Sequence, residues 1–171
     1  LDSIYKSFAV GLRLCWIHAR QDILHHVNLV KQGSDLCSSN LSHYGDRSYF
    51  QRVDWRGYVR NLTELYRERR DAILDALAEF MPEGVDWTRP EGGFFIWVTL
   101  PSYVDATDML PQAIAHNVAY VPGEGFYAGG QGKNCMRLNF SFAEPEDIRR
   151  GVESLAAVVR AQTETSERSA A

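Results

Sequence analysis

Apolar residues recur at helical spacing through one long stretch in the middle of the chain. From Asp54 to Phe80 they keep to one face of a helix, although Arg69 interrupts the apolar stripe. Pro82 and Gly84 follow, and both residue types commonly end helices. The pattern therefore predicts one long helix over about residues 54–80.

Shorter apolar segments separated by turns follow the long helix. Residues 94–100 form a predicted strand that Pro101 closes, and residues 85–87 and 118–121 are predicted to add shorter strands. Between Met136 and Ser141 apolar and polar residues alternate, which predicts a strand with one buried face. Arg137 falls on the polar face of that strand.

Two further helices are predicted in this half of the chain. Asp105 or Asp108 caps the first, and Pro111 favours the later start because a helix tolerates proline in its first turn and not deeper. Pro145 suits the first position of the second helix, and the polar tail from Gln162 is expected to be frayed. Together these elements predict a strand-rich α+β module over about residues 82–163.

The first fifty residues have a less regular pattern. Leu12, Leu14 and Trp16 alternate with Arg13 and Cys15, which predicts a short strand with no evident neighbour to pair with. Residues 19–32 carry apolar residues at helical spacing, whereas residues 33–49 are polar and irregular.

Composition and charge argue against several classes of function. The chain has 171 residues with 18 basic and 22 acidic side chains, and its net charge of −4 argues against a nucleic-acid binder. The longest clean apolar run, Phe94 to Val98, is too short to cross a membrane. The cysteines are dispersed, with none in a C-x-x-C pair. This argues against a disulfide scaffold or a metal site and favours the reducing cytoplasm.

Four motifs, in order, resemble one enzyme family. The segment S-I-Y-K-S-F-A-V-G-L-R-L-C-W at 3–16 is similar to the active-site lysine segment of fold-type I aminotransferases, which use pyridoxal phosphate (PLP). R-P-E-G-G-F-F-I-W-V-T-L-P at 89–101, V-P-G-E-G-F-Y at 121–127 and M-R-L-N-F-S at 136–141 resemble the C-terminal part of the same class I/II family. The resemblance covers about residues 1–160 and is nearest to the aminoadipate and aromatic aminotransferase branch.

The resemblance implies roles for four residues. Lys6 would form a Schiff base with the PLP aldehyde, for which its amine must lose a proton, and would then move the proton of the substrate α-carbon. Ser3 and Arg13 would bind the cofactor phosphate, because hydroxyl and guanidinium groups donate hydrogen bonds to phosphate oxygens. Arg137 would hold the substrate α-carboxylate through two parallel hydrogen bonds and so orient the reacting carbon.

The resemblance also implies the fold and the partners. It predicts an α/β protein with a remnant of the PLP-binding large domain at 1–53, a connecting helix at 54–81, a small α+β domain at 82–163 and a frayed tail at 164–171. The substrates would be an amino acid and a 2-oxo acid, and the full-length parent would be a cytoplasmic homodimer. The acid that pairs with the PLP ring nitrogen in this family cannot be placed in this sequence, so we expect the 171-residue chain to be inactive by itself.

Two alternatives stand beside the enzyme. The same family includes PLP-binding effector domains of transcription regulators, which need not catalyse turnover. A degenerate, inactive remnant is the third hypothesis, and it predicts apolar surface exposed to water. Departures from the family pattern motivate it: Tyr5 replaces a small hydroxyl residue, Cys15 replaces a glycine, and His43 stands where the family often has glutamine.

Overall fold

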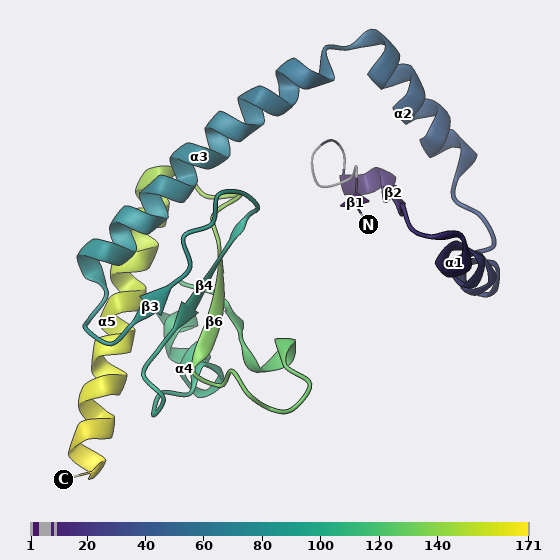
Figure 1. The fold of residues 1–171 in the computed structure, drawn as a ribbon. Helices are drawn as coiled ribbons and strands as arrows, with labels where there is room; N and C mark the ends of the chain where they lie inside the picture. Colours follow the sequence, from purple (N-terminus) through teal and green to yellow (C-terminus); the bar gives the residue numbers. More distant parts are fainter. Residues whose placement is uncertain (1, 4–7, 9, 171) are drawn as a thin grey trace. The chain divides into compact units, whose positions relative to one another are not determined.

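The computed structural model describes residues 2–3, 8 and 10–170, which divide into two compact units (Figure 1). The first unit comprises Leu1–Leu62 and the second Thr63–Ala171. The boundary falls inside the long helix α3, Trp55–Phe80, which matches the helix predicted over 54–80. The second unit therefore contains the last turns of α3 as well as the module predicted at 82–163.

The first unit contains two short strands, two helices and the first turns of α3. The strand predicted over Leu12–Trp16 is reduced to β2, Cys15–Trp16, because the residues before it form a 3-10 turn and a left-handed residue. It does have a neighbour, since β1, Asp2–Ser3, pairs with it antiparallel. The 3-10 helix η2, Val10–Leu12, precedes β2. Helix α1 spans Gln21–Ser34, as predicted, whereas helix α2 spans Asn40–Arg52, where the pattern had indicated an irregular segment.

That expectation for α2 was wrong because the helix is held by a cap and by aromatic contacts rather than by an apolar stripe. The Ser39 side chain accepts a hydrogen bond from the backbone N–H of Ser42, which satisfies one of the free donors at the helix start. The ring of Phe8 lies 3.9 Å from that of Tyr49 and 5.8 Å from that of Phe50. Contacts between residues so far apart in the chain produce no periodic pattern in the sequence, so the pattern could not predict this helix.

The second unit is built on a four-stranded antiparallel sheet with strand order β3-β4-β6-β5. The strands are β3 (Asp86–Trp87), β4 (Phe95–Thr99), β6 (Cys135–Asn139) and β5 (Val121–Pro122). The strand predicted over 118–121 is thus reduced to its last residue and the next. The backbone N–H of residue 118 instead donates to the carbonyl of Ala113, at the end of a helix.

Helix α4, Ala106–Ala115, begins earlier than expected. The Asp105 carboxylate caps it by accepting hydrogen bonds from the backbone N–H groups of Thr107 at 2.8 Å and Asp108 at 3.3 Å. Pro111 therefore lies inside the helix, beyond its first turn, and the start at Asp108 that it favoured was wrong. The cap satisfies free donors at the helix start, which helps to offset the hydrogen bond that proline cannot donate.

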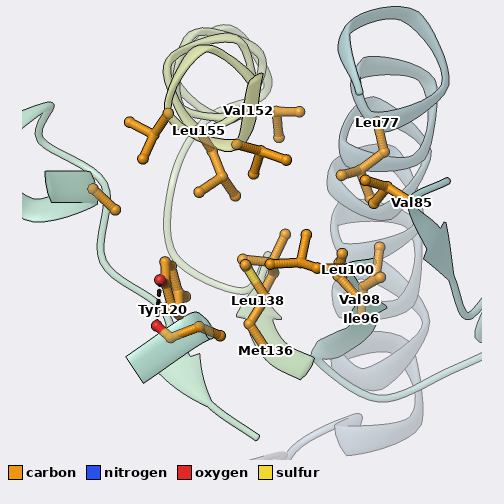
Figure 2. Close-up of a cluster of buried hydrophobic side chains, with 14 of the residues drawn as sticks. Leu77, Val85, Ile96, Val98, Leu100, Tyr120, Met136, Leu138, Val152 and Leu155 are labelled. Atoms are coloured by element: carbon orange, nitrogen blue, oxygen red, sulfur yellow. Dashed lines mark hydrogen bonds between the residues drawn. The ribbon is translucent and has the colours of Figure 1, made fainter. Parts of the chain in front are cut away.

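One hydrophobic core fills the space between the sheet and helices α3, α4 and α5 (Figure 2). Helix α5 spans Pro145–Ala170 and continues past Gln162, where the sequence indicated a frayed tail. The core side chains include the following, from α3, β4, β6 and α5 in turn: Leu77; Ile96 and Val98; Met136 and Leu138; Val152 and Leu155. The helices cover this face of the sheet, so alternate residues of β4 and β6 lie on the opposite face.

Arg69, which interrupts the apolar stripe of α3, is buried in the second unit. Its Nη1 donates to the Ser141 carbonyl at 2.7 Å, and its Nη2 donates to Glu144 Oε1 at 2.5 Å. The guanidinium thereby joins α3 to the turn between β6 and α5. A buried charge is tolerated at this position because two acceptors bind its terminal nitrogens, although its buried Nε has no hydrogen-bond partner.

Candidate functional site

Arg137 lies at the centre of the sheet face that the helices leave open. It is the middle residue of β6, between the buried Met136 and Leu138, which confirms the predicted alternation. Its register partners are Trp97 on β4 and Val121 on β5. Because both neighbouring strands are hydrogen-bonded to β6, the backbone that carries this arginine is held on both sides.

Two phenylalanine rings contact the guanidinium of Arg137. Its Cζ lies 4.1 Å from the centroid of the Phe95 ring and 4.7 Å from that of the Phe126 ring. Phe95 is on β4, two residues before Trp97 and therefore on the same sheet face. Phe126 ends the 3-10 helix η3, Glu124–Phe126. Both distances are within the range of cation–π attraction.

The described residues around Arg137 neither neutralise its charge nor accept a hydrogen bond from its Nε. Its Nε is buried without a hydrogen-bond partner, and no ion pair joins its guanidinium to a carboxylate in the part of the chain that the structure describes. Arg137 lines a cleft of about 190 Å³ together with Phe95, Ala119, Tyr120, Val121 and Asn139. A partly buried cation with unused donors beside a cleft is suited to bind an anionic group such as a carboxylate.

Tyr120 also lines this cleft, but its hydroxyl is not available to donate a proton to a ligand there. Its hydroxyl donates to the Ala106 carbonyl at 2.6 Å. Burial raises the pKa of Tyr120 above its ordinary value, and the negative charge of Asp105 raises this pKa further. The hydroxyl therefore stays neutral and engaged with the backbone at physiological pH.

The predicted cofactor residues belong to the first unit. Ser3 pairs with Cys15 in the β1–β2 ladder, and Arg13 precedes β2 with a left-handed backbone φ of 54°. Lys6 lies outside the described residues. A left-handed conformation costs a residue other than glycine about 1–2 kcal/mol, and such conformations cluster at functional sites.

The chemistry of these residues fits the phosphate and the aldehyde of PLP. Ser3, Lys6 and Arg13 supply a hydroxyl, an amine and a guanidinium, and these are the groups that a phosphate ester and an aldehyde require. Among the described residues, no cluster of three or more histidine, cysteine or acidic side chains could hold a metal ion. No helix in that part of the chain is long and apolar enough to span a membrane.

Sequence reasoning missed the two rings beside Arg137. Strand alternation would have placed Phe95 on the same sheet face as Trp97, although it says nothing of which strand lies alongside. Phe126 belongs to the V-P-G-E-G-F-Y motif, whose sequence does not indicate that the chain folds back over β6.

Comparison with known proteins gives the family. The family described as aminotransferase class I and II matches residues 3–155. The chain is 42% identical over 160 residues to aromatic-amino-acid aminotransferase 1 of Thermococcus litoralis, covering 94% of this chain and 38% of that protein. The structure resembles the multiple substrate aminotransferase of Thermococcus profundus with a TM-score of 0.89 and 39% identity, over 95% of this chain and 40% of that one. It also resembles LysN, the α-aminoadipate aminotransferase of Thermus thermophilus, which was solved with N-(5'-phosphopyridoxyl)-L-leucine. The TM-score is 0.88 and the identity 31%, over 95% of this chain and 42% of that one.

Transcription regulators are also related, at lower identity. An uncharacterized HTH-type regulator of Bacillus subtilis, YdfD, is 26% identical over 160 residues, which are 94% of this chain and 33% of that protein. The chain thus spans about two fifths, or less, of the length of the relatives that it matches. Because the family matches residues 3–155 and a relative is 42% identical over 94% of the chain, this chain belongs to the class I and II aminotransferase family.

Proposed function

We propose that this chain carries the cofactor-lysine segment and the substrate-carboxylate domain of a PLP-dependent aminotransferase. The reaction is transfer of an amino group from an amino acid to a 2-oxo acid. The observation that carries the proposal is Arg137, a cation with a buried, unpartnered Nε that lines a cleft on the open face of the sheet. Family membership supports the reaction type.

Each residue has a defined task in this proposal. Arg137 binds the α-carboxylate of the amino acid, and the two hydrogen bonds of a guanidinium–carboxylate pair orient the α-carbon. Ser3 and Arg13 hold the phosphate of the cofactor. Lys6 binds the cofactor aldehyde through Nζ, and the same amine removes and returns the proton of the substrate α-carbon. PLP, when bound, supplies the electron sink that makes this proton acidic.

Borohydride reduction in the presence of PLP tests the assignment of Lys6. The chain contains three lysines, Lys6, Lys31 and Lys133, so peptide mapping after reduction identifies the modified residue. We expect selective modification of Lys6, which Lys6→Arg abolishes and Lys133→Arg does not affect. Equal modification of all three lysines, or of none, contradicts a cofactor site in this chain.

Turnover is tested on the full-length parent. We expect it to convert PLP to the pyridoxamine form with an amino acid alone, and Arg137→Gln to weaken that half-reaction roughly 100-fold, because charge-assisted bidentate bonds are strong. A parent that binds PLP without this half-reaction, and that carries a winged-helix segment before the large domain, is a regulator instead. We further propose that the parent is a cytoplasmic homodimer.

One observation favours the inactive-remnant alternative. The apolar side chains Ile23, Leu29 and Val30 of α1 are exposed, and α1 buries none of its residues, all of which the structure describes. Exposed apolar surface promotes association. A monodisperse, cooperatively melting monomer in size-exclusion chromatography and calorimetry contradicts this alternative, whereas aggregation of the isolated chain supports it.

A further inference from the structure

The guanidinium of Arg137 is held by neutral rings instead of by a negative charge. Phe95 and Phe126 contact it at 4.1 and 4.7 Å, and no ion pair of Arg137 occurs among the described residues. Seven other arginines among the described residues instead form an ion pair with a carboxylate, as Arg149 does with Glu79. A carboxylate would position the guanidinium and also cancel its charge, whereas an aromatic face positions it and leaves the charge for a ligand.

The ring of Phe126 is itself held in place from two sides. The Trp97 ring packs edge-on against it with a centroid distance of 5.3 Å and an interplanar angle of 85°. Trp97 is also the register partner of Arg137, so the same tryptophan lies beside both the Phe126 ring and Arg137. Phe126 therefore lies in contact with both members of a cross-strand pair, and its backbone N–H donates to the carbonyl of Gly123 at 2.9 Å.

The turn that delivers Phe126 is anchored directly to β6. The backbone N–H of Gly123 donates to the carbonyl of Cys135 at 2.8 Å. A Cβ at position 123 would lie 2.6 Å from the Cβ of Cys135 and 2.7 Å from the carbonyl oxygen of Gly132, which is closer than side chains approach. Only glycine lets the chain pass this close to the strand, so this close approach sets the distance between η3 and Arg137.

Phe126 is not needed to fill the core. Its side chain is about half exposed, at 49%, and it lies on the sheet face opposite the helices. A large apolar side chain that stays half exposed contributes less burial energy than a core residue. The contacts of its ring with Arg137 and Trp97 are therefore better explained by the position of the arginine than by the stability of the fold.

We propose that Phe126 is a positioning residue for substrate binding: with Phe95 it forms an aromatic clamp that fixes the guanidinium of Arg137 without neutralising it. This inference rests on the proposed function of Arg137 as the carboxylate-binding residue. The clamp lets the site bind the carboxylate of an amino acid or a 2-oxo acid without first releasing an internal counter-charge. Removing the Phe126 ring would keep the positive charge of Arg137 but would no longer fix the orientation of its guanidinium.

The clamp is tested in the full chain without any ligand. In NMR spectra of arginine-labelled protein, the Arg137 Nε–Hε signal is identified as the one missing from Arg137→Lys. We expect Phe126→Leu to speed its exchange with water about 2- to 30-fold, the range of a cation–π contact, while the backbone amides of β6 exchange as before. Phe126→Tyr should restore the slow rate, and Phe142→Leu, which alters a phenylalanine that is 92% exposed, should not change it.

Binding of a probe separates failure of the clamp from failure of the proposed function. The probe is phenylpyruvate, with phenylacetone as the matched compound that lacks the carboxylate. We expect Arg137→Gln to abolish the preference for phenylpyruvate, and Phe126→Leu to reduce it about 2- to 30-fold with rescue by Phe126→Tyr. An unchanged Nε–Hε exchange rate in Phe126→Leu, or faster exchange of the β6 amides together with it, overturns the clamp. Equal binding of the two compounds by the wild-type chain instead overturns the proposed function.

Discussion

The buried arginine on α3 gives a quantitative prediction for the stability of the second unit. In Arg69→Met the apolar stem is kept and both hydrogen bonds are lost. The bond to the Ser141 carbonyl is partly buried and involves a charged donor, and bonds of that kind contribute about 1.5–3 kcal/mol. The bond to Glu144 reaches a carboxylate that is 69% exposed, and such pairs contribute about 0.2–1 kcal/mol.

These values predict that Arg69→Met lowers the free energy of unfolding of the second unit by about 2 kcal/mol, chiefly through the carbonyl bond. The assay is hydrogen exchange of the backbone amides of β4 and β6, because these strands report on this unit alone. A loss of about 2 kcal/mol makes their exchange about 30-fold faster, since 1.36 kcal/mol is a factor of ten. Glu144→Gln keeps a side-chain oxygen that can accept the hydrogen bond from Arg69, so it should make the exchange of these amides less than about 5-fold faster.

The matched control is Arg67→Met, on the same helix. Arg67 pairs with Glu64 on the exposed surface, so we expect Arg67→Met to lower the free energy of unfolding by less than about 0.5 kcal/mol. If Arg69→Met exchanges within twofold of the wild type, or if Glu144→Gln has as large an effect as Arg69→Met, then the carbonyl bond is not what stabilises this turn.

Two further substitutions in the second unit are predicted to change its stability. Gly151→Ala in α5 should raise stability by about 0.5–1 kcal/mol in thermal unfolding, because a Cβ there meets nothing within 4 Å; a lower melting temperature would contradict this. Tyr120→Phe loses the hydrogen bond to Ala106 and should cost about 1 kcal/mol at neutral pH. Because folding raises the pKa of Tyr120, its contribution is complete below its ordinary pKa of 10.0 and is lost as the pH rises above that value. Denaturant titrations of the wild type should therefore show this alkaline loss, and those of Tyr120→Phe should show less of it.

Local patterns in the sequence determined the parts of this protein that depend on near neighbours along the chain. The period of a helix predicted α3, and the alternation of β6 placed Arg137 on the face opposite the core. The four motifs also led to the family, which the comparisons confirm. All of these features repeat or match within short segments, so sequence alone carries them.

The tertiary structure decided the features that join distant segments. The ring of Phe8 packs against helix α2, and α4 starts at the Asp105 cap although Pro111 lies within it. Arg69 is buried because Ser141 and Glu144 lie alongside it. The rings at 95 and 126 meet Arg137 only because strand register and a glycine-dependent turn bring them there. No periodic pattern encodes such contacts, since each depends on how separate elements pack against one another.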